Sequence, residues 1–527
     1  MSTDNKNITV YIPQDTLSIA LGADGLEQQV KSWASKHNGS IQVIRNGSRG
    51  LYWLEPLVEV DAGNGQRLAY GPMDTDAMEL LLNTADWYLG APEHSLYLCD
   101  IERHPYLANQ ERLTFARIGL FDPTNIYSYQ EHQGFTGLRN ALKLSPEDVV
   151  DQLIRSGLRG RGGAAFPTGI KWQTVANTRA PQKYIICNAD EGDSGGFSDR
   201  IVMEADPFAL IEGMVIAGYA VGATRGSIYL RSEYPHTQKI LEKTIKIAYK
   251  HGFLGTDILG SGFNFDLDIF KGAGAYICGE ETSLLESMEG KAGLVRAKPP
   301  LPAHQGYLGL PTVVNNVVTL ASATTVLAKG ADHYANYGMG RSRGTLSFQI
   351  SGNIKQGGLV EKAFGLTLRQ LVEDFGQGTL SGGPIKALQV GGPLGAYIPE
   401  HLWDTPLDYE AFQNIGGMIG HGGVVAFDEH ANIPALAKHA MDFCAFESCG
   451  KCTPCRIGST RASEIIENLN SPQHDYQQQK ELLLELCETM EHSSLCALGG
   501  MAPFPVRSLI KIYEEDFLSP KKEAPNV

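Results

Sequence analysis

The sequence predicts a multidomain chain that combines α/β and α+β domains and ends in a helical domain. Strand and helix signals alternate as far as residue 428, and glycines are dense from 157 to 195. The segment after residue 428 has helical periodicity and contains a crowded group of cysteines. A chain of 527 residues is long enough for three or four domains. We predict domains at 1–110, 111–335, 336–428 and 429–527.

The first domain, with its connector, is predicted to be a small α/β unit. Short apolar runs predict strands at 8–12, 41–44, 57–60 and 68–70, and helical periodicity predicts a helix at 26–36. A polar, irregular stretch with Pro105, Glu111 and Arg112 follows. Because such a stretch is typical of a connector, we expect the first domain to end near residue 110.

The second domain is predicted to be a layered α/β domain. Ser145 precedes Pro-Glu-Asp and predicts the start of a helix that runs to Ile154, and Asp206-Pro207 predicts the start of another. Apolar runs at 184–187 and 227–230 predict buried strands, and alternation at 263–270 predicts a third. Strands that alternate with helices predict a sheet covered by helices.

The last two domains differ in character. Residues 343–425 are rich in strand signals, at 346–350, 385–390 and 423–426, with one helix expected at 368–374 and capped by Thr367. This pattern predicts a compact α+β module. From Asn432 onward the periodicity is helical.

Charge and composition exclude several classes of protein. The 59 acidic and 44 basic residues give a net charge of −15, which argues against a nucleic-acid or anionic-membrane surface. The longest apolar stretches, near 208–223 and 310–328, contain Glu212 and the pair Asn315 and Asn316, so we expect buried helices there and no membrane span. The polar start and the nine cysteines indicate a reducing compartment, with the cytoplasm as the expected location.

Three cysteines spaced by three residues predict an iron–sulfur cluster. The run is Cys449-Gly-Lys-Cys452-Thr-Pro-Cys455, the ligand spacing of a [4Fe–4S] centre that takes its fourth thiolate from elsewhere. The downstream candidates for the fourth ligand are Cys496 and Cys487. The alternatives are a structural zinc site or a disulfide cluster, but zinc sites usually pair two Cys-x-x-Cys or Cys/His units.

A glycine-rich segment at 158–172 predicts a phosphate-binding loop. Successive glycines expose backbone N–H groups, and Arg159, Arg161 and Lys171 add positive charge to an otherwise acidic chain. The pattern Gly160-x-Gly162-x-x-Ala165 is similar to the Rossmann fingerprint, but it follows a helix signal where that fingerprint follows a strand. A plain flexible loop is the other alternative.

Two further loops carry polar groups suited to a nucleotide. The run from Cys187 to Gly195 follows a strand and contains an amide and three carboxylates, which suit ribityl or ribose hydroxyls and ring N–H groups. The run from Gly272 to Glu281 follows the strand signal at 263–270 and opens a helix. Its paired carboxylates would also complement a helix dipole, but their place beside Tyr276 and three glycines favours nucleotide contacts.

Five motifs occur together in one order. They are Gly-Arg-Gly-Gly-x-x-Phe-Pro-Thr-Gly-x-Lys-Trp from residue 160, Asn-Ala-Asp-Glu from 188, Gly-Ala-Tyr-Ile-Cys-Gly-Glu-Glu-Thr from 274, Asn-Asn-Val from 315 and Glu-Ser-Cys-Gly-Lys-Cys-Thr-Pro-Cys-Arg from 447. This set resembles the FMN-binding, NADH-oxidising subunit of respiratory complex I and its relatives over residues 140–515. Within that group the chain most resembles the β subunit of soluble molybdenum- or tungsten-dependent, NAD-linked formate dehydrogenases.

The resemblance implies a fold for each domain and three cofactors. The expected parts are a thioredoxin-like N-terminal domain, an α/β FMN- and NADH-binding domain, a ubiquitin-like (SLBB-type) α+β module and a helical bundle with one [4Fe–4S] cluster. FMN contacts are implied for Gly160, Arg161, Gly162, Lys171, Asn188, Asp190, Glu191, Asn315 and Asn316. NAD(H) contacts are implied for Phe166, Glu191, Asp193, Tyr276, Glu280, Glu281 and Lys298, and cluster ligation for Cys449, Cys452, Cys455 and Cys496, the last because of its setting Ser-Leu-Cys.

The chain departs from the family pattern at three places. Asp193 replaces the usual second glutamate of the acidic loop, and Thr174 and Leu301 stand where the family has aromatic residues that stack on adenine. The N-terminal domain has Ser48 and Tyr52 where thioredoxin-like ferredoxins have cysteines. We therefore expect residues 1–105 to be a docking module without a second cluster.

The resemblance implies an electron-transfer subunit of an NAD-dependent oxidoreductase. Hydride would pass between NAD(H) and FMN, and single electrons between FMN and the cluster, with Glu191 and Glu280 tuning the site. The expected partners are a large molybdenum- or tungsten-pterin subunit that oxidises formate and contains iron–sulfur clusters, and a small [2Fe–2S] subunit. Complex I or an NAD-reducing hydrogenase is the alternative assembly, and a metal-stabilised, non-redox nucleotide-binding scaffold is the remote one.

Overall fold

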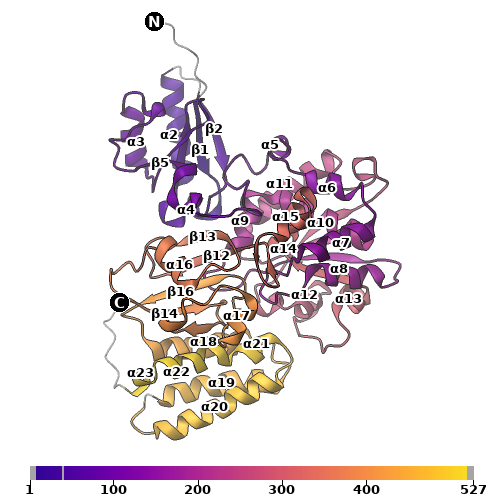
Figure 1. Ribbon diagram of the computed structural model, residues 1–527, viewed down its shortest axis with the longest axis vertical. Coiled ribbons are helices and arrows are strands. Elements are labelled where there is room, and N and C mark those ends of the chain that lie inside the picture. The colour runs from indigo at the N-terminus through magenta and orange to yellow at the C-terminus, as the bar shows by residue number, and fades with distance from the viewer. Residues whose placement is uncertain (1–7, 38–40, 470, 519–527) are drawn as a thin grey trace.

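The computed structural model describes residues 8–37, 41–469 and 471–518. It has a mixed α/β architecture with a helical region at the C-terminal end. An N-terminal sheet, a parallel sheet covered by helices, a second mixed sheet and the helical region follow one another along the chain (Figure 1). The predicted combination of α/β and α+β parts with a helical end is therefore confirmed.

The N-terminal sheet has the order β2-β1-β3-β4-β5, in which only the β1–β2 pair is parallel. The four strands and the helix predicted here are confirmed, and β5 and α3 were not predicted. The elements are β1 (Ile8–Pro13), α1 (Thr16–Ala20), α2 (Ala23–Lys36), β2 (Ile41–Asn46), β3 (Val58–Asp61), β4 (Arg67–Tyr70), α3 (Thr75–Asn83), β5 (Tyr97–Asp100) and α4 (Pro105–Ala108).

The second sheet is entirely parallel and has the order β8-β7-β6-β9. Its strands are β6 (Tyr184–Ala189), β7 (Arg225–Leu230), β8 (Asp266–Lys271) and β9 (Thr312–Asn316). The chain moves from β6 toward β7 and β8 on one side and returns to β9 on the other, so the strand order reverses beside β6. Ligands of open parallel sheets bind outside the carboxyl ends of the strands at such a reversal, and this edge carries the acidic loop and the Asn315–Asn316 pair.

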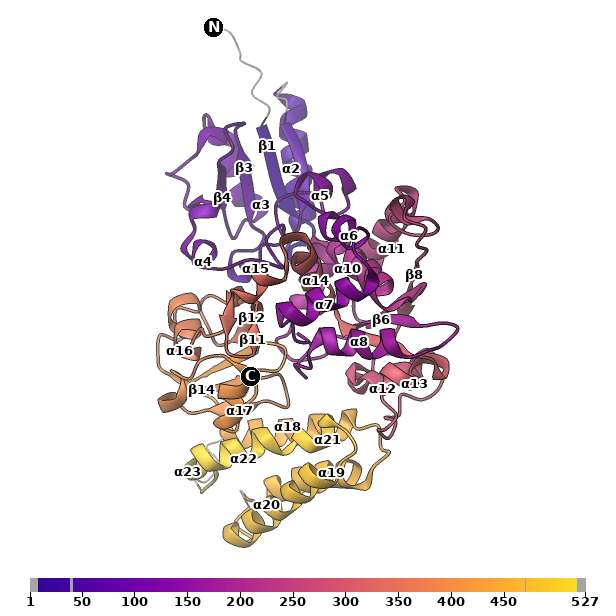
Figure 2. The ribbon, with the colours of Figure 1, turned by 45° about the vertical axis from the view of Figure 1, so that its right-hand side comes forward.

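Helices cover one face of the parallel sheet, and alternate side chains of β6 face two different cores. Ile185 and Cys187 pack in the largest core with α10 (Pro207–Val221) and α14 (Val317–Lys329), whereas Ile186 packs in a core that includes α12 (Glu281–Met288) and the helical region. Figure 2 shows α7, α8, α10 and α14 grouped beside β6. The remaining helices of this part are α5 (Ile126–Glu131), α6 (Thr136–Ala141), α7 (Pro146–Ser156), α8 (Thr168–Asn177), α9 (Ser198–Ala205), α11 (Pro235–Lys250), α13 (Pro302–Gln305) and α15 (Ala331–Ala335).

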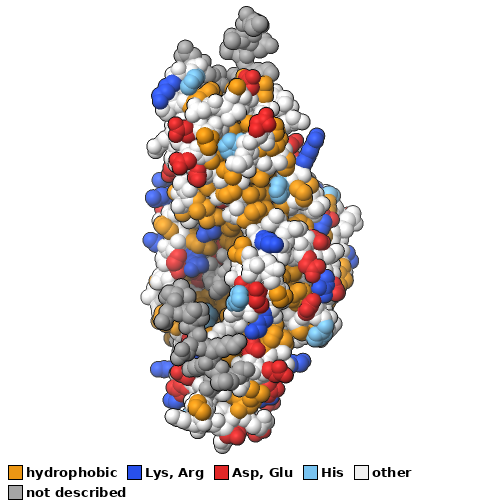
Figure 3. Space-filling view, turned by 90° about the vertical axis from the view of Figure 1, so that its left-hand side faces the viewer, with side chains coloured by type: hydrophobic (Ala, Val, Ile, Leu, Met, Phe, Trp, Pro, Cys, Tyr) orange, Lys and Arg blue, Asp and Glu red, His pale blue; other side chains and the backbone are white. Residues whose placement is uncertain are grey.

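The apolar stretch near 208–223 is the buried helix α10, as predicted. The stretch near 310–328 was expected to be helical throughout, but its first part is the buried parallel strand β9 and only the part from Val317 is the buried helix α14. Among the described residues, no helix combines the length and the apolar character needed to cross a membrane. On the face shown in Figure 3, hydrophobic side chains gather over the upper part of the molecule and charged side chains surround them.

The mixed sheet has the order β13-β12-β16-β14-β15 and packs beside the helical region. Its helix near residue 368 begins with a capping box formed by Thr367 and Gln370, as the sequence indicated for Thr367. The elements are β10 (Gly338–Met339), β11 (Ser342–Arg343), β12 (Thr345–Gly352), β13 (Gly358–Ala363), α16 (Leu368–Gln370), β14 (Ile385–Val390), β15 (Ala396–Ile398), α17 (Tyr409–Asn414) and β16 (Gly423–Asp428). The helical region comprises α18 (Ile433–Glu447), α19 (Thr453–Leu469), α20 (Tyr476–Ser493), α21 (Ala497–Met501), α22 (Pro503–Ile512) and α23 (Glu514–Leu518).

Candidate functional site

The glycine-rich loop connects α7 to α8 and closes on itself. Gly157 ends α7 with a φ of +67°, and Arg159 forms an antiparallel bridge with Pro167. Within the loop, the Gly160 N–H donates to the Phe166 carbonyl at 2.8 Å. The loop therefore follows a helix, and the strand–loop–helix arrangement of the Rossmann fingerprint is absent there.

This loop lies against the carboxyl end of β9. A Cβ on Gly162 would lie 2.9 Å from the Asn316 Cβ, so the close approach requires glycine. Asn316 caps α14, and Thr319 in the first turn of α14 accepts a hydrogen bond from the Arg161 N–H at 2.8 Å. Sequence reasoning did not single out Thr319; its position three residues after an N-cap asparagine was the available signal.

The structure does not present the charge of Arg161 at the site surface. Its side chain is 0% exposed, lies over the Phe364 ring and donates to the Tyr334 hydroxyl at 2.9 Å. Because this guanidinium is buried, the implied FMN contact of Arg161 stays a prediction that would rest on the backbone of the glycine loop. Lys171, a nearby cation, remains partly accessible; it donates to the Val314 carbonyl at 2.9 Å and lies 3.5 Å from Glu281.

The acidic loop leaves one carboxylate oxygen without a partner. Asn188 donates to the Gly279 carbonyl at 2.8 Å and thereby joins the end of β6 to the second glycine run. Asp190 Oδ2 is buried and has no hydrogen-bond partner among the described residues. Burial raises the pKa of Asp190 to about 7, and Arg231 opposes this only in part.

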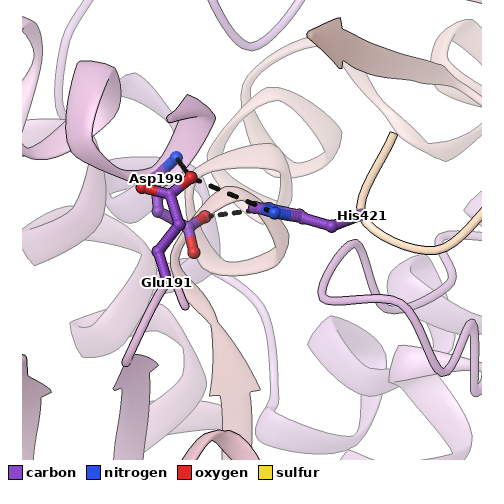
Figure 4. Close-up of side chains that lie close together, drawn as sticks. All are labelled: Glu191, Asp199 and His421. Atoms are coloured by element: carbon purple, nitrogen blue, oxygen red, sulfur yellow. Dashed lines mark hydrogen bonds and ion pairs between the residues drawn. The ribbon is translucent and has the colours of Figure 1, made fainter. Parts of the chain in front are cut away.

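Glu191, Asp199 and His421 form a buried group that we call the loop cluster. Glu191 accepts from the backbone N–H groups of Asp199 and Arg200 at 2.9 and 3.0 Å and so caps the start of α9. His421, from the loop before β16, lies 3.4 Å from Asp199 and 4.0 Å from Glu191 (Figure 4). The three ligand atoms lie within 4.8 Å of one another, a spacing that a cation could use.

In the loop cluster the imidazolium of His421 itself supplies the positive charge. Burial by itself lowers the pKa of His421, but the neighbouring carboxylates, first Asp199 and then Glu191, raise it to about 9. Burial and Asp199 raise the pKa of Glu191 to about 7. Asp199 also accepts two hydrogen bonds from the Asn316 amide, at 2.7 and 2.9 Å. The cluster therefore holds Asn316, an expected flavin contact, in place.

The side chain of Glu191 is fully buried within this cluster. This carboxylate holds the acidic loop to the start of α9, and the implied contacts of Glu191 with FMN and NAD(H) stay predictions. The sequence did not indicate Asp199 or His421 as site residues, and His421 comes from a different sheet.

The second glycine run brings the expected NAD(H) residues together. The Tyr276 hydroxyl donates to Asp193 at 2.9 Å, and the Tyr276 N–H donates to Glu447 at the end of α18. Lys298 lies 2.9 Å from both Glu280 and Glu281. Phe166 is 50% exposed, so its ring is open to a ligand, and Leu301 is also exposed.

The predicted cluster ligands lie in one hydrophobic core between α18, α19 and α21. Cys455 is buried in this core, and Cys449, Cys452 and Cys496 pack against it. Burial raises the pKa of Cys496 to about 11, opposed by the Leu498 and Gly499 N–H groups at the start of α21 and reinforced by Glu280 and Cys455. Donors at a helix start favour a thiolate.

Cys487 is the alternative fourth thiol, and its surroundings differ. It lies fully buried in α20, and burial raises its pKa to about 12. The charged groups that act on it are Arg507 and Glu491, whereas those acting on Cys496 include Cys455. The arrangement favours Cys496.

Ser48 and Tyr52 of the N-terminal domain have other partners. The Ser48 hydroxyl donates to Glu55 at 2.5 Å, and the Tyr52 ring packs against Phe197 with a centroid distance of 4.5 Å. The Tyr52–Phe197 contact joins the first domain to the start of α9, and the docking role of residues 1–105 stays a prediction.

The residues at the edge of the parallel sheet fit a flavin nucleotide. The glycine loop leaves its backbone close to Asn316 with no intervening side chain, and Asp190 Oδ2 is a buried acceptor that lacks a donor among the described residues. A ribityl hydroxyl or a ring N–H group supplies such a donor. The fold and the site thus define a nucleotide-binding protein with an adjacent site for an iron–sulfur cluster.

Comparisons with known proteins identify the family. Residues 153–325 match the family model of the Nuo51 FMN-binding domain, and residues 435–520 match that of the NADH-ubiquinone oxidoreductase-F iron-sulfur binding region. The NADP-reducing hydrogenase subunit HndC of Solidesulfovibrio fructosivorans is 44% identical over 77% of this chain and 83% of its own. An NADH-quinone oxidoreductase subunit of Escherichia coli is 39% identical over 75% of this chain and 89% of its own. The chain belongs to the family of FMN- and iron–sulfur-binding NADH dehydrogenase subunits.

A solved structure extends the similarity to the N-terminal domain. A chain of an NAD⁺-reducing [NiFe]-hydrogenase in the H₂-reduced state matches 98% of this chain and 84% of its own length, with a TM-score of 0.68 and 28% identity. The cofactors of this protein are FMN, a [4Fe–4S] cluster and NAD(H), as the sequence predicted. It is a subunit of an NAD-dependent oxidoreductase.

Proposed function

We propose that this chain exchanges a hydride with NAD(H) and exchanges single electrons, through its cluster, with a formate-oxidising partner that supplies the electrons for NAD⁺ reduction. The observation that carries the proposal is the meeting of the expected nucleotide loops at one edge of the parallel sheet, with the cysteines adjacent. Bound FMN supplies the conversion between two-electron and one-electron transfer.

The chain's own residues bind and orient the reactants. The glycine loop approaches Asn316 closely, and the N–H groups it exposes suit a phosphate. Asp190 offers its free oxygen to a flavin or ribityl donor. Tyr276 and Phe166 offer ring surfaces to NAD(H), and Glu280 and Glu281 are placed for ribose hydroxyls. Because hydride transfer needs a stacked geometry more than an acid or base, we assign no proton-transfer residue.

The helical region connects the nucleotide site to the partner. Glu447 at the end of α18 accepts the Tyr276 N–H at 3.0 Å, and the charge of Glu280 acts on Cys496. The NAD(H) residues and the proposed cluster ligands therefore lie next to each other. Electrons would pass between this cluster and the partner's clusters, since we expect no second centre in the N-terminal domain.

Cysteine variants test the proposed ligands. The Cys496→Ser variant should lose most of the broad iron–sulfur absorbance and the electron paramagnetic resonance signal of the reduced cluster while its FMN absorbance remains. Cys487→Ser is the matched control, since Cys487 is also a buried thiol of the helical region, and it should keep the cluster. Loss of the cluster in Cys487→Ser with retention in Cys496→Ser would reverse the assignment.

The most specific part of the proposal is that formate is the electron donor. Its support is the resemblance of the whole set of motifs, with the variant acidic loop Glu191-Gly-Asp193-Ser-Gly195, to the β subunits of cytoplasmic formate dehydrogenases. Purification from the native host should yield a complex with a large molybdenum- or tungsten-pterin subunit, and a small [2Fe–2S] subunit is expected. That complex should reduce NAD⁺ with formate; a complex inactive with formate contradicts the assignment.

A hydrogen-linked assembly is the second candidate. It is favoured by the 44% identity to the HndC hydrogenase subunit and by the match of a hydrogenase chain to 98% of this one. A nickel-containing or iron-only hydrogenase partner and hydrogen-dependent NAD⁺ reduction would select it. Association with a membrane-bound assembly that oxidises NADH would instead select complex I.

A further inference from the structure

A cavity of about 580 Å³ lies beside the glycine loop, outside the residues assigned to FMN and NAD(H). Its walls are the end of α7, the Arg159–Pro167 bridge, the end of α15 and the β10–β11 hairpin. Four arginines line it, at Arg155, Arg159, Arg341 and Arg343. In a chain of net charge −15, this concentration of cations needs an explanation.

The carboxylates near the cavity compensate these arginines only in part. Asp332 pairs with Arg155 at 2.9 Å. Glu410 pairs with Arg159 at 2.7 Å and is also the carboxylate nearest to Arg341, at 3.9 Å. Within the described part of the chain, four guanidinium groups thus share two carboxylates, which leaves an excess of two positive charges. The carbonyl ends of α7 and α15 offset roughly half a charge each at most, so the cavity stays positive.

The buried Arg161 adds to this imbalance, and Arg343, one of the cavity arginines, has no carboxylate partner in the described structure. Arg343 donates to the Ala335 carbonyl at 3.4 Å, and no ion pair is found for it among the described residues. Arg161 donates to the Arg343 carbonyl at 2.6 Å, and its Nε and Nη1 atoms are buried without partners in the described part of the chain. A buried cation without a carboxylate is costly, and an anion nearby lowers that cost.

We propose that this cavity binds a small phosphate-bearing anion with several charges. Guanidinium groups recognise phosphate oxygens through paired N–H donors. The volume falls in the range of small-molecule sites, roughly 300–1,000 Å³, and exceeds what one phosphate fills. The described residues that line the cavity include no aromatic side chain, so the ligand is recognised by its phosphates and not by stacking of a base.

The site is placed to act on the cofactor loop. Arg159 and Pro167 line the cavity and also bracket the loop that contains Gly160, Gly162 and Phe166. An anion that fixes Arg159 would hold both ends of this loop together. The bound anion should therefore slow the loss of FMN and leave the chemistry of hydride transfer unchanged.

Titration of the holoprotein with inorganic triphosphate tests the proposal by calorimetry. The wild type should bind one equivalent with an affinity that falls as salt rises. The double variant Arg341→Gln/Arg343→Gln should bind at least about tenfold more weakly, because two charge-assisted contacts are lost. Arg461→Gln, an exposed arginine paired with Glu464 on α19, is the matched control and should bind like the wild type.

Three further measurements keep the result unambiguous. The single variant Arg341→Gln removes a side chain that is 75% exposed, so it tests binding without disturbing packing. Titrations with orthophosphate and with a nucleoside triphosphate, compared with triphosphate, show by their affinities whether the site prefers a free polyphosphate or a nucleotide. Equal triphosphate affinity in wild type and double variant, no binding at all, or inhibition that is competitive with NADH and unchanged in the double variant would each overturn the proposal.

Discussion

The two ends of α9 each carry a group of buried carboxylates, and the two groups are compensated differently. At the start of the helix, the loop cluster of Glu191, Asp199 and His421 contains a cation. At its end, Glu204 lies with Asp15 and Glu55 at the contact between the first domain and α9; we call these three residues the junction cluster.

The junction cluster is held by hydroxyl groups and a retained proton. Ser18 Oγ lies 2.6 Å from Asp15 and 2.9 Å from Glu55. A hydroxyl donates only one proton, so one of these contacts requires a protonated carboxyl group. Burial, and then Asp15, raise the pKa of Glu55 to about 8, which identifies Glu55 as the proton carrier. The charge of Arg200 lowers the pKa of Asp15, but this influence is weaker than that of burial, which raises it.

This contrast teaches that the protein neutralises buried acid by different means at the site and at the domain contact. At the site, the imidazolium of His421, which comes from a different sheet, fixes the loop cluster beside Asn316, whose side chain must be held in one orientation. A proton is sufficient at the junction, where the first domain packs against the end of α9. The two clusters should therefore respond differently to substitution and to pH.

Removal of the cation from the loop cluster should have the largest effect. His421→Gln leaves two buried carboxylates without their counter-charge, and breaking a buried pair costs about 3–5 kcal/mol. Denaturant unfolding should show this loss, together with a lower FMN content. His430→Gln changes an exposed histidine of the same region and should leave both unchanged. An unaltered stability in His421→Gln would show that the imidazolium is not needed.

The pH dependence separates the two clusters. Because the pKa of Glu55 rises from 4.5 to about 8 on folding, the folded state loses stability as pH rises between these values. Because the pKa of His421 rises from 6.5 to about 9, its stabilisation is complete below pH 6.5 and is lost as pH approaches 9. Melting temperatures should fall from pH 5 to 9.

Glu55→Gln should make the fall in stability between pH 5 and 8 shallower, while the contributions of Glu191 and Asp190, whose pKa values rise to about 7, remain. The amide keeps a neutral side chain, so the variant should gain about 2 kcal/mol near neutral pH relative to the wild type. Thermal unfolding measured at several pH values checks this. A variant whose profile still matches that of the wild type between pH 5 and 8 would place the proton elsewhere, and the comparison of the clusters would then fail.

Glu191→Gln should change the stability of the protein less than His421→Gln or Glu55→Gln does. The amide accepts one of the two α9 N–H groups and faces the other with its own N–H group, a loss of about 1–2 kcal/mol. Since the loop continues to Asp193, the KM for NADH should rise while FMN stays bound. Glu233→Gln, a nearby accessible carboxylate paired with Arg231, is the control. Loss of FMN in Glu191→Gln would contradict the assignment.

The smallest expected effect is the coupling between the clusters. They lie at opposite ends of α9 and share no residue, so the stability changes of His421→Gln and Glu55→Gln should add within about 0.5 kcal/mol in the double variant. A larger coupling measured by denaturant unfolding would show that α9 transmits charge or strain between the site and the junction.

Much of the site could be predicted because its residues belong to local patterns. Asn188 and Asp190 follow a strand, and the three cysteines at 449, 452 and 455 are close in sequence, so local structure alone places them together. The helix before the glycine loop was also evident from its start signal. Such signals are short-range, and the strands, caps and turns that they specify are confirmed.

The tertiary structure decided which residues from distant parts of the sequence lie in contact. His421 is 230 residues away from Glu191, and the arginine cavity joins residues near 155 to residues near 341. Only chain packing shows that Arg161 is buried and that Cys496 lies beside Cys455. The sequence by itself determined the motifs, the cofactors and the family. The fold decided which side chains face a ligand, because burial and charge compensation depend on contacts between distant segments.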